Sequence, residues 1–160
     1  MLKLETINEK NVWEIVNLHV RKEQESFVAS NGESLIEAYV AVARNGSVFP
    51  FGLYDGETPV GFLMIGFDGI DSGDSAPKIV RGNYCIWRLM IDERYQHRGY
   101  GRKAVELALG FIRTFPCGEA EYCYLSYEPE NICAKSLYAE FGFTENGEKD
   151  EEETVAVLRL

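Results

Sequence analysis

The segment from about Asn83 to Ile91 constrains the fold more than any other part of the chain. From Tyr84 onward it reads Tyr-Cys-Ile-Trp-Arg-Leu-Met-Ile, so apolar side chains occupy both alternating positions. Because successive side chains of a strand point to opposite faces, a strand of this kind is covered on both faces. The sequence therefore predicts a central strand in a sheet that helices cover.

The other segments alternate between strand and helix patterns. Apolar residues recur at helical spacing in some of them and form short apolar runs in others. Asp55-Gly56 is a hairpin signal between two strands, and the polar stretch 68–81 is interpreted as a loop. Helices are expected at about Glu9–Glu25, Glu33–Arg44, Gly99–Phe115 and Asn131–Phe141, and further strands at Leu2–Ile7, Val48–Tyr54, Pro59–Phe67, Glu121–Tyr127, Phe143–Lys149 and Thr154–Leu160. The order β-α-α-β-β-β-α-β-α-β-β predicts a mixed α/β sheet in one domain, residues 1–160.

The charge balance limits the possible partners. The 16 Lys and Arg against 26 Asp and Glu give a net charge of −10. Nucleic acids and anionic membranes are bound through basic residues, so we expect neither as a partner, whereas a cationic small molecule suits an acidic surface that also favours solubility. The four cysteines lack CxxC or zinc-ligand spacing, no signal-peptide core follows Met1, and no apolar run reaches membrane length. These features predict a cytoplasmic protein without a metal site.

The chemistry begins directly after the central strand. Residues 91–102 read Ile-Asp-Glu-Arg-Tyr-Gln-His-Arg-Gly-Tyr-Gly-Arg, in which Gly99 and Gly101 open a helix. Glycines let a ligand approach the backbone, and the first N–H groups of a helix together with its dipole favour an anion. Arg98 and Arg102 flank the turn, which suits a pyrophosphate. Glycines that only permit tight strand-to-helix packing are the alternative, and the segment is neither a dinucleotide fingerprint nor a P-loop.

A second pattern follows the next strand. Residues 131–143 read Asn-Ile-Cys-Ala-Lys-Ser-Leu-Tyr-Ala-Glu-Phe-Gly-Phe. Asn131 and Tyr138 are two helical turns apart and therefore share one face. Asn131 is a candidate helix cap, and Tyr138 can offer a hydroxyl beside an apolar wall. A tyrosine at the edge of the core is the alternative.

Together, Gln-x-x-Gly-x-Gly and Asn-x-x-Ala-x-x-Leu-Tyr-x-x-x-Gly-Phe resemble the GNAT acetyltransferase family. The resemblance covers the element order of the whole chain and is strongest from Trp87 to Phe143. It implies a GNAT-like acyl-CoA N-acyltransferase fold. It also implies acetyl-CoA as co-substrate and transfer of its acetyl group to an amine.

The resemblance further implies roles for individual residues. The backbone of Leu89, Met90 and Ile91 would pair with the pantetheine arm, and Tyr138 would protonate the leaving CoA thiolate after direct attack in a ternary complex. The other positions implied to bind the cofactor are Gln96, His97, Arg98, Gly99, Tyr100, Gly101, Arg102 and Asn131. Independently of the family, backbone N–H groups of a splayed or bulged strand can stabilise the oxyanion of acyl transfer, and general acid catalysis contributes about 10²–10⁴-fold.

The general base is not evident from the sequence. Many relatives are thought to use a carboxylate on the central strand, but none lies between Cys85 and Arg88. Water, Glu128 or a carboxylate of the first helix are the alternatives. Cys85 is disfavoured as an acetyl-carrying nucleophile, because a thiol needs a neighbouring base or dipole to lower its pKa. His19 is interpreted as a core histidine on an apolar helical face, and residues 150–153 as a charged turn.

Weaker signals concern the amine. Stretches such as Tyr84–Asp92 and Asn146–Glu148 resemble bacterial diamine or spermine/spermidine acetyltransferases, which favours a polyamine such as spermidine or spermine. A polyamine requires several carboxylates, and cation–π contacts can help to hold it. Glu25 and Asp68 are the individual candidates within a larger set of carboxylates comprising Glu23, Glu33, Glu37, Asp71 and Asp74.

Other functions stay open at this point. The acceptor could be a protein N-terminus, a lysine of a ribosomal protein or an aminoglycoside. The missing carboxylate on the central strand leaves a non-catalytic acyl-CoA-binding module as a further alternative. The resemblance, and not the composition, suggests a homodimer.

Overall fold

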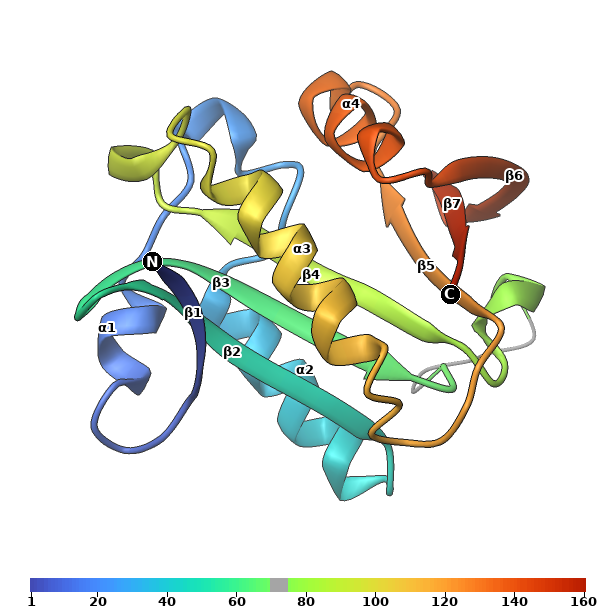
Figure 1. The fold of residues 1–160 in the computed structure, drawn as a ribbon, viewed down its shortest axis with the longest axis horizontal. Helices are drawn as coiled ribbons and strands as arrows, with labels where there is room; N and C mark the ends of the chain where they lie inside the picture. Colours follow the sequence, from blue (N-terminus) through green and yellow to red (C-terminus); the bar gives the residue numbers. More distant parts are fainter. Residues whose placement is uncertain (70–74) are drawn as a thin grey trace.

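A seven-stranded sheet forms the centre of the molecule in the computed structural model, which describes residues 1–69 and 75–160 (Figure 1). The strands lie in the order β1-β2-β3-β4-β5-β7-β6, and every neighbouring pair is antiparallel except β4 and β5. Their bounds are β1 (Leu2–Thr6), β2 (Ser47–Asp55), β3 (Thr58–Phe67), β4 (Tyr84–Ile91), β5 (Tyr122–Tyr127), β6 (Thr144–Asp150) and β7 (Glu153–Arg159). The helices are α1 (Val12–Val16), α2 (Asn31–Ala43), α3 (Tyr100–Ile112) and α4 (Ile132–Glu140), with 3₁₀ turns η1 (Lys22–Gln24), η2 (Lys78–Val80) and η3 (Glu93–Tyr95). The predicted mixed α/β sheet is confirmed.

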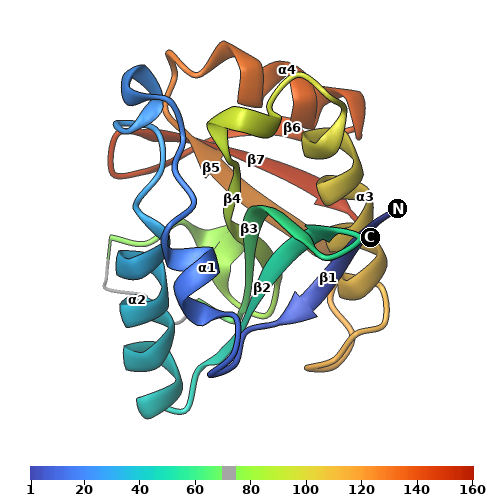
Figure 2. The ribbon, with the colours of Figure 1, turned by 90° about the vertical axis from the view of Figure 1, so that its left-hand side faces the viewer.

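Helices cover both faces of this sheet. Figure 2 shows α1 and α2 on one side of the strands and α3 on the other. Two apolar clusters correspond to these faces: one contains Val105 of α3, and the other contains Ile15 of α1. Strand β4 contributes Ile86 to the first cluster and Met90 to the second, so it is covered on both faces as predicted. Within the two described ranges, no helix combines the length and apolar character needed to cross a membrane.

The first helix is much shorter than predicted. Helical periodicity suggested Glu9–Glu25, but α1 ends at Val16 and only the 3₁₀ turn η1 follows. His19, expected in the core, is exposed, and Trp13 is 72% exposed. The cause is a long-range contact: the backbone N–H of His19 donates to Asp92 Oδ2 at 3.0 Å, and the His19 carbonyl accepts from the N–H of Glu93 at 2.8 Å. These bonds hold the chain against the end of β4 in place of a continuing helix.

Asp92 connects this segment to the loop after β4. Its side chain is 2% exposed and accepts from Arg94 Nε at 2.7 Å and from the Arg94 backbone N–H at 3.1 Å, besides the bond from His19. Burial raises the pKa of Asp92, but the hydrogen bonds from Arg94 and His19 outweigh it and leave the pKa below its ordinary value. The ionised carboxylate therefore stabilises the folded state.

Replacing this carboxylate should lower stability in a pH-dependent way. Asp92→Asn retains the size but removes the charge, and we expect a loss of about 2 kcal/mol in the free energy of unfolding at pH 7. Because the folded pKa is depressed, the contribution is complete above the ordinary pKa of 3.8 and is lost as the pH falls through the folded value. Urea unfolding from about pH 7 down to about pH 3 measures the difference from wild type.

Glu93→Gln is the matched control, because Glu93 is the exposed neighbour and the variant changes charge equally. It should stay within about 0.5 kcal/mol of wild type. A difference between wild type and Asp92→Asn that stayed constant below pH 4 would contradict the role of the ionised form.

Candidate active site

The sheet opens between its two parallel strands. Only two residue pairs join β4 to β5, Tyr84 with Cys123 and Cys85 with Tyr124. Strand β4 then continues to Ile91 and β5 to Tyr127 without further pairing between them, and Figure 1 shows the strands separating toward the end where α3 begins. The edge of β4 formed by residues 86–91 thus has no strand partner, and its backbone groups, apart from the Ile91 carbonyl that accepts from Gln96, are available for hydrogen bonds to an extended ligand. Leu89, Met90 and Ile91 lie on this edge.

A bulge lies at the point where the strands part. On its other side β4 pairs with β3, where Met64 opposes Arg88 and Ile65 opposes Ile86. Trp87 is therefore the extra residue. A bulge breaks the ladder locally and redirects backbone groups, as the oxyanion stabilisation considered from the sequence requires.

The loop after β4 is pinned to the end of that strand. Gln96 Nε2 donates to the carbonyl of Ile91 at 3.0 Å and to Gln24 Oε1 at 2.8 Å. His97 has φ +60° and Gly99 has φ +82°, so left-handed residues alternate with others immediately before α3. Such turns gather successive backbone N–H groups, and the first N–H groups of α3 have no acceptor within the helix. The loop is therefore suited to bind an anion.

The two glycines of the loop are not explained by internal packing. A Cβ at Gly99 would have no atom within 4 Å, and a Cβ at Gly101 would meet only Leu137 Cδ2, at 3.5 Å, an ordinary van der Waals distance. Gly99 is explained by its positive φ, which glycine adopts without steric cost. Gly101 has no such conformational reason. This favours close approach of a ligand over the alternative of tight packing.

The side chains around the loop are partly engaged by the protein. Arg102 forms an ion pair with Glu140 of α4, and the Tyr100 hydroxyl donates to Asp55 at 2.6 Å. Arg98 donates to the carbonyl of Arg94 at 3.0 Å and remains exposed, as does His97. The Tyr100 side chain is thus engaged within the protein and Glu140 neutralises Arg102, whereas Arg98 remains an exposed cation beside the start of α3.

Tyr138 lies in a pocket of aromatic side chains. It is 8% exposed, stacks on Tyr127 with ring centroids 6.2 Å apart, and meets the edge of Phe143 at 5.9 Å. Burial raises the pKa of Tyr138 far above its ordinary value, and Cys123 and Glu153 add to the effect. The phenol therefore holds its proton at neutral pH, which is the state that a general acid needs before the reaction.

Asn131 begins the helix that carries this tyrosine. Its Oδ1 accepts from the backbone N–H of Ala134 at 3.2 Å, which confirms the predicted cap. The cap fixes the start of α4 after β5, and thereby helps to place Tyr138 beside Tyr127 at the end of β5. With Oδ1 engaged, the amide nitrogen is the part of Asn131 left for a ligand.

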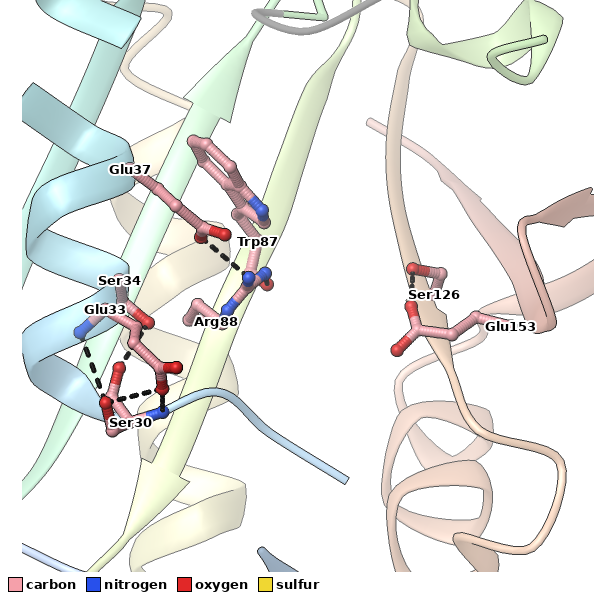
Figure 3. A network of polar contacts seen from close by, with 8 residues as sticks. All are labelled: Ser30, Glu33, Ser34, Glu37, Trp87, Arg88, Ser126 and Glu153. Atoms are coloured by element: carbon pink, nitrogen blue, oxygen red, sulfur yellow. Dashed lines mark hydrogen bonds and ion pairs between the residues drawn. The ribbon is translucent and has the colours of Figure 1, made fainter. Parts of the chain in front are cut away.

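The face of the sheet that carries α2 presents a polar network at the same opening. Figure 3 shows Arg88 of β4 bonded to Glu37 of α2, at 2.7 Å, and Glu153 of β7 reaching Ser126 of β5. The Arg88 Nη1 also donates to the carbonyl of Trp87 at 3.1 Å. Among the described residues, Arg88 Nε is the buried side-chain polar atom without a hydrogen-bond partner. A buried donor left unpaired is costly, so Nε is a candidate contact for a ligand oxygen.

The predicted amine-binding carboxylates do not gather in one place. Asp68 follows β3, where its Oδ1 accepts from the N–H of Gly82 at 2.6 Å and its own N–H bonds Asn83, at the start of β4. Glu25 is exposed next to Gln24, whose side chain touches the loop beyond the other end of β4. Among the other carboxylates, Glu33 closes a capping box with Ser30, Glu37 reaches β4, and Asp71 and Asp74 lie outside the described residues.

The cysteine thiols and a possible metal site are the remaining candidates for chemistry. Burial raises the pKa of Cys85 to about 11, so its thiol is protonated and a poor nucleophile at neutral pH. All four cysteines are free thiols. No group of three or more His, Cys, Asp or Glu side chains within residues 1–69 and 75–160 could hold a metal ion.

Comparison with known proteins agrees with this geometry. Residues 12–143 match the acetyltransferase (GNAT) family, and the chain belongs to that family. It is 32% identical over 151 residues to the spermine/spermidine N(1)-acetyltransferase of Bacillus subtilis strain 168, covering 93% of this chain and 91% of that protein. The chain is accordingly an acetyl-CoA-dependent N-acetyltransferase.

Solved structures show the same fold at lower identity. Aminoglycoside acetyltransferase AAC(6')-Ib in complex with coenzyme A and kanamycin superposes with a TM-score of 0.77 at 19% identity, covering 99% of this chain and 95% of that one. Spermidine N-acetyltransferase from Vibrio cholerae in complex with CoA and spermine gives a TM-score of 0.68 at 19% identity, with the same coverage.

Gly101 offers a test of the loop that separates binding from folding. Gly101→Ala places a methyl group in ordinary contact with Leu137 and improves helix propensity, so we expect equal or slightly higher stability, by up to ~1 kcal/mol. The same methyl group would obstruct a ligand on the backbone, and we expect acetyl-CoA to bind about tenfold more weakly, or ~1.4 kcal/mol. Thermal unfolding and calorimetric titration with CoA measure the two effects.

Gly110→Ala in the same helix is the control, because a Cβ there also has open space and Gly110 is remote from the loop. It should raise stability similarly and leave CoA affinity unchanged. Unchanged affinity in Gly101→Ala as well would remove Gly101 from the binding surface.

Proposed function

We propose that this acetyltransferase acts on a primary amine of a polyamine such as spermidine or spermine, by direct attack in a ternary complex with Tyr138 as the general acid. The observation that supports the chemistry is the buried phenol of Tyr138, whose ring stacks on Tyr127 at the end of β5, beyond the last pairing of β5 with β4. The observation that carries the substrate class is the identity to the B. subtilis spermine/spermidine acetyltransferase along almost the whole chain.

The residues present fit acetyl-CoA. The pyrophosphate would lie on the backbone of residues 96–102, where left-handed turns, two glycines and Arg98 provide N–H groups, space and positive charge. The pantetheine arm would pair with the open edge of Leu89, Met90 and Ile91. The thioester would then lie beside the Trp87 bulge, within reach of the α4 side of the opening.

In the proposed reaction, backbone groups at the bulge and the phenol of Tyr138 act at different steps. The amine nitrogen attacks the thioester carbonyl, and backbone N–H groups at the bulge stabilise the charge on its oxygen. As the C–S bond breaks, the phenol of Tyr138 gives its proton to the sulfur. Acetylated amine and free CoA are the products. Apolar neighbours such as Tyr127 and Phe143 keep the phenol neutral until that step.

A polyamine also suits the charge on the face of the sheet that carries α2. Glu37 and Glu153 lie on the side of β4 and β5 that carries α2, and the chain as a whole has a net charge of −10. An acidic surface attracts a molecule with several ammonium groups. Aminoglycosides are polycations as well, and the fold of AAC(6')-Ib makes them the second candidate class.

The substrate class is tested by product analysis. The protein with acetyl-CoA and a mixture of putrescine, spermidine, spermine, kanamycin and an N-terminal peptide should yield acetylated spermidine or spermine preferentially, detected by mass spectrometry. Preferential acetyl-kanamycin would replace the polyamine by the second class. CoA binding without any product would contradict the polyamine assignment.

Tyr138→Phe tests the acid. The variant keeps the aromatic packing and loses only the hydroxyl, so we expect kcat to fall about 10²-fold with CoA affinity unchanged. Tyr127→Phe is the matched control: its ring stacks on Tyr138, but its hydroxyl donates to Glu145 at 3.0 Å, and it should retain wild-type kcat. Equal kcat in Tyr138→Phe and wild type would exclude Tyr138 as the acid.

A further inference from the structure

The opening between β4 and β5 has chemically different groups on its two faces. Tyr127 belongs to the apolar cluster that contains α3, and Tyr138 stacks on it. The preceding residue, Ser126, points to the opposite face because successive side chains of a strand alternate. Arg88 marks that same face on β4, since it reaches Glu37 of α2. The acid and the polar network of Figure 3 therefore approach the opening from opposite sides.

Glu153 is the carboxylate of this network that lies on the β5 side. It begins β7, is half-buried, and accepts a hydrogen bond from the hydroxyl of Ser126. Its partner Ser126 lies two residues beyond Tyr124, the last residue of β5 that pairs with β4, and on the face that also carries Arg88. Glu37, by contrast, is already paired with Arg88. Of the two carboxylates, Glu153 is the one without a cationic partner at ion-pair distance among the described residues.

We propose that Glu153, held by Ser126, accepts the proton that the substrate ammonium must lose before its nitrogen attacks. This assignment rests on the proposed direct transfer and supplies its missing base. Glu153 is a catalytic residue in this scheme, because its carboxylate contacts the reacting nitrogen. Ser126 is a positioning residue.

The proton balance of the reaction is complete with these two groups. The ammonium gives one proton to Glu153, and the neutral amine forms the C–N bond to the carbonyl carbon. The C–S bond breaks, and the sulfur takes the proton of the Tyr138 phenol. The nitrogen, now part of an amide, loses a second proton, which restores the phenol through solvent, while Glu153 releases its proton to bulk water. The net products are acetylated amine, CoA and one proton.

The surroundings of Glu153 favour this role. Burial raises the pKa of Glu153 above its ordinary value, Glu128 and Asp150 raise it further, and the hydrogen bond from Ser126 and the charge of Arg88 oppose them. A carboxylate with a raised pKa is a stronger base than one in water, and rates are highest when the pKa of the base approaches the working pH. Below its pKa Glu153 is protonated, so kcat/KM should fall on the acid side.

Glu153→Gln tests the proposal directly. We expect kcat to fall about 10²-fold at pH 7, with CoA affinity and thermal stability close to wild type. The fall in kcat/KM at low pH that protonation of Glu153 causes in the wild type (the acid limb of the pH profile) should disappear. The variant should instead gain rate with pH as the free amine becomes available in solution, so that the difference from wild type narrows toward pH 9.5.

Two further variants separate catalysis from structure. Glu152→Gln, in the exposed turn before β7, is the matched control and should behave as wild type. Ser126→Ala keeps the charge of Glu153 and removes its donor, so we expect a smaller loss of about three- to tenfold and a shifted acid limb. A loss in Glu153→Gln that stayed constant from pH 6 to 9.5, or no loss at all, would overturn the role of Glu153.

The test does not depend on the identity of the amine. The variants are compared on whichever substrate wild type acetylates fastest in the product analysis. Failure to acetylate polyamines would refute the proposed substrate while leaving Glu153 to be judged on another amine. An unaltered pH profile on a good polyamine substrate would refute Glu153 alone.

Discussion

The parallel pairing of β4 with β5 is limited to two residue pairs, and the arrangement of the site depends on where it stops. Beyond Cys85 and Tyr124 the two strands diverge, so a row of backbone groups on β4 lacks a strand partner. The bulge at Trp87 lies in this stretch of β4, the loop that leads into α3 follows the end of β4, and α4 follows β5. The main chain of the unpaired β4 edge and of the loop before α3 is thus suited to an extended ligand that ends in an anion.

Side chains then differentiate the two faces of this opening. The face with α4 is aromatic and keeps Tyr138 protonated, whereas the face with α2 carries the Arg88–Glu37 ion pair and the Ser126–Glu153 hydrogen bond. Burial is the largest cause of the raised pKa of both Tyr138 and Glu153. For the phenol, burial strengthens the protonated form, and for the carboxylate it increases the affinity for a proton.

The sequence was informative wherever local chemistry decides the structure. Apolar residues on both faces predicted the central position of β4, and the glycine turn and Asn131 predicted the starts of α3 and α4. It failed where distant residues decide. The bond that the His19 backbone N–H donates to Asp92 holds the chain where the first helix was expected to continue. A run of charged residues concealed Glu153, which the pairing of β5 with β7 brings beside Ser126. The available signal was the strand-forming run Thr-Val-Ala-Val-Leu directly after Glu153, which places Glu153 at the start of a strand and not within a turn.

The open edge of β4 has a consequence for how such an enzyme diversifies. In the proposed mechanism the donor is recognised through main-chain groups, which nearly every substitution leaves in place. In the same proposed mechanism the acceptor would meet side chains from α2, β5 and β7, and side chains change with the sequence. Mutational drift can therefore alter the range of amines while recognition of the acyl donor is inherited unchanged.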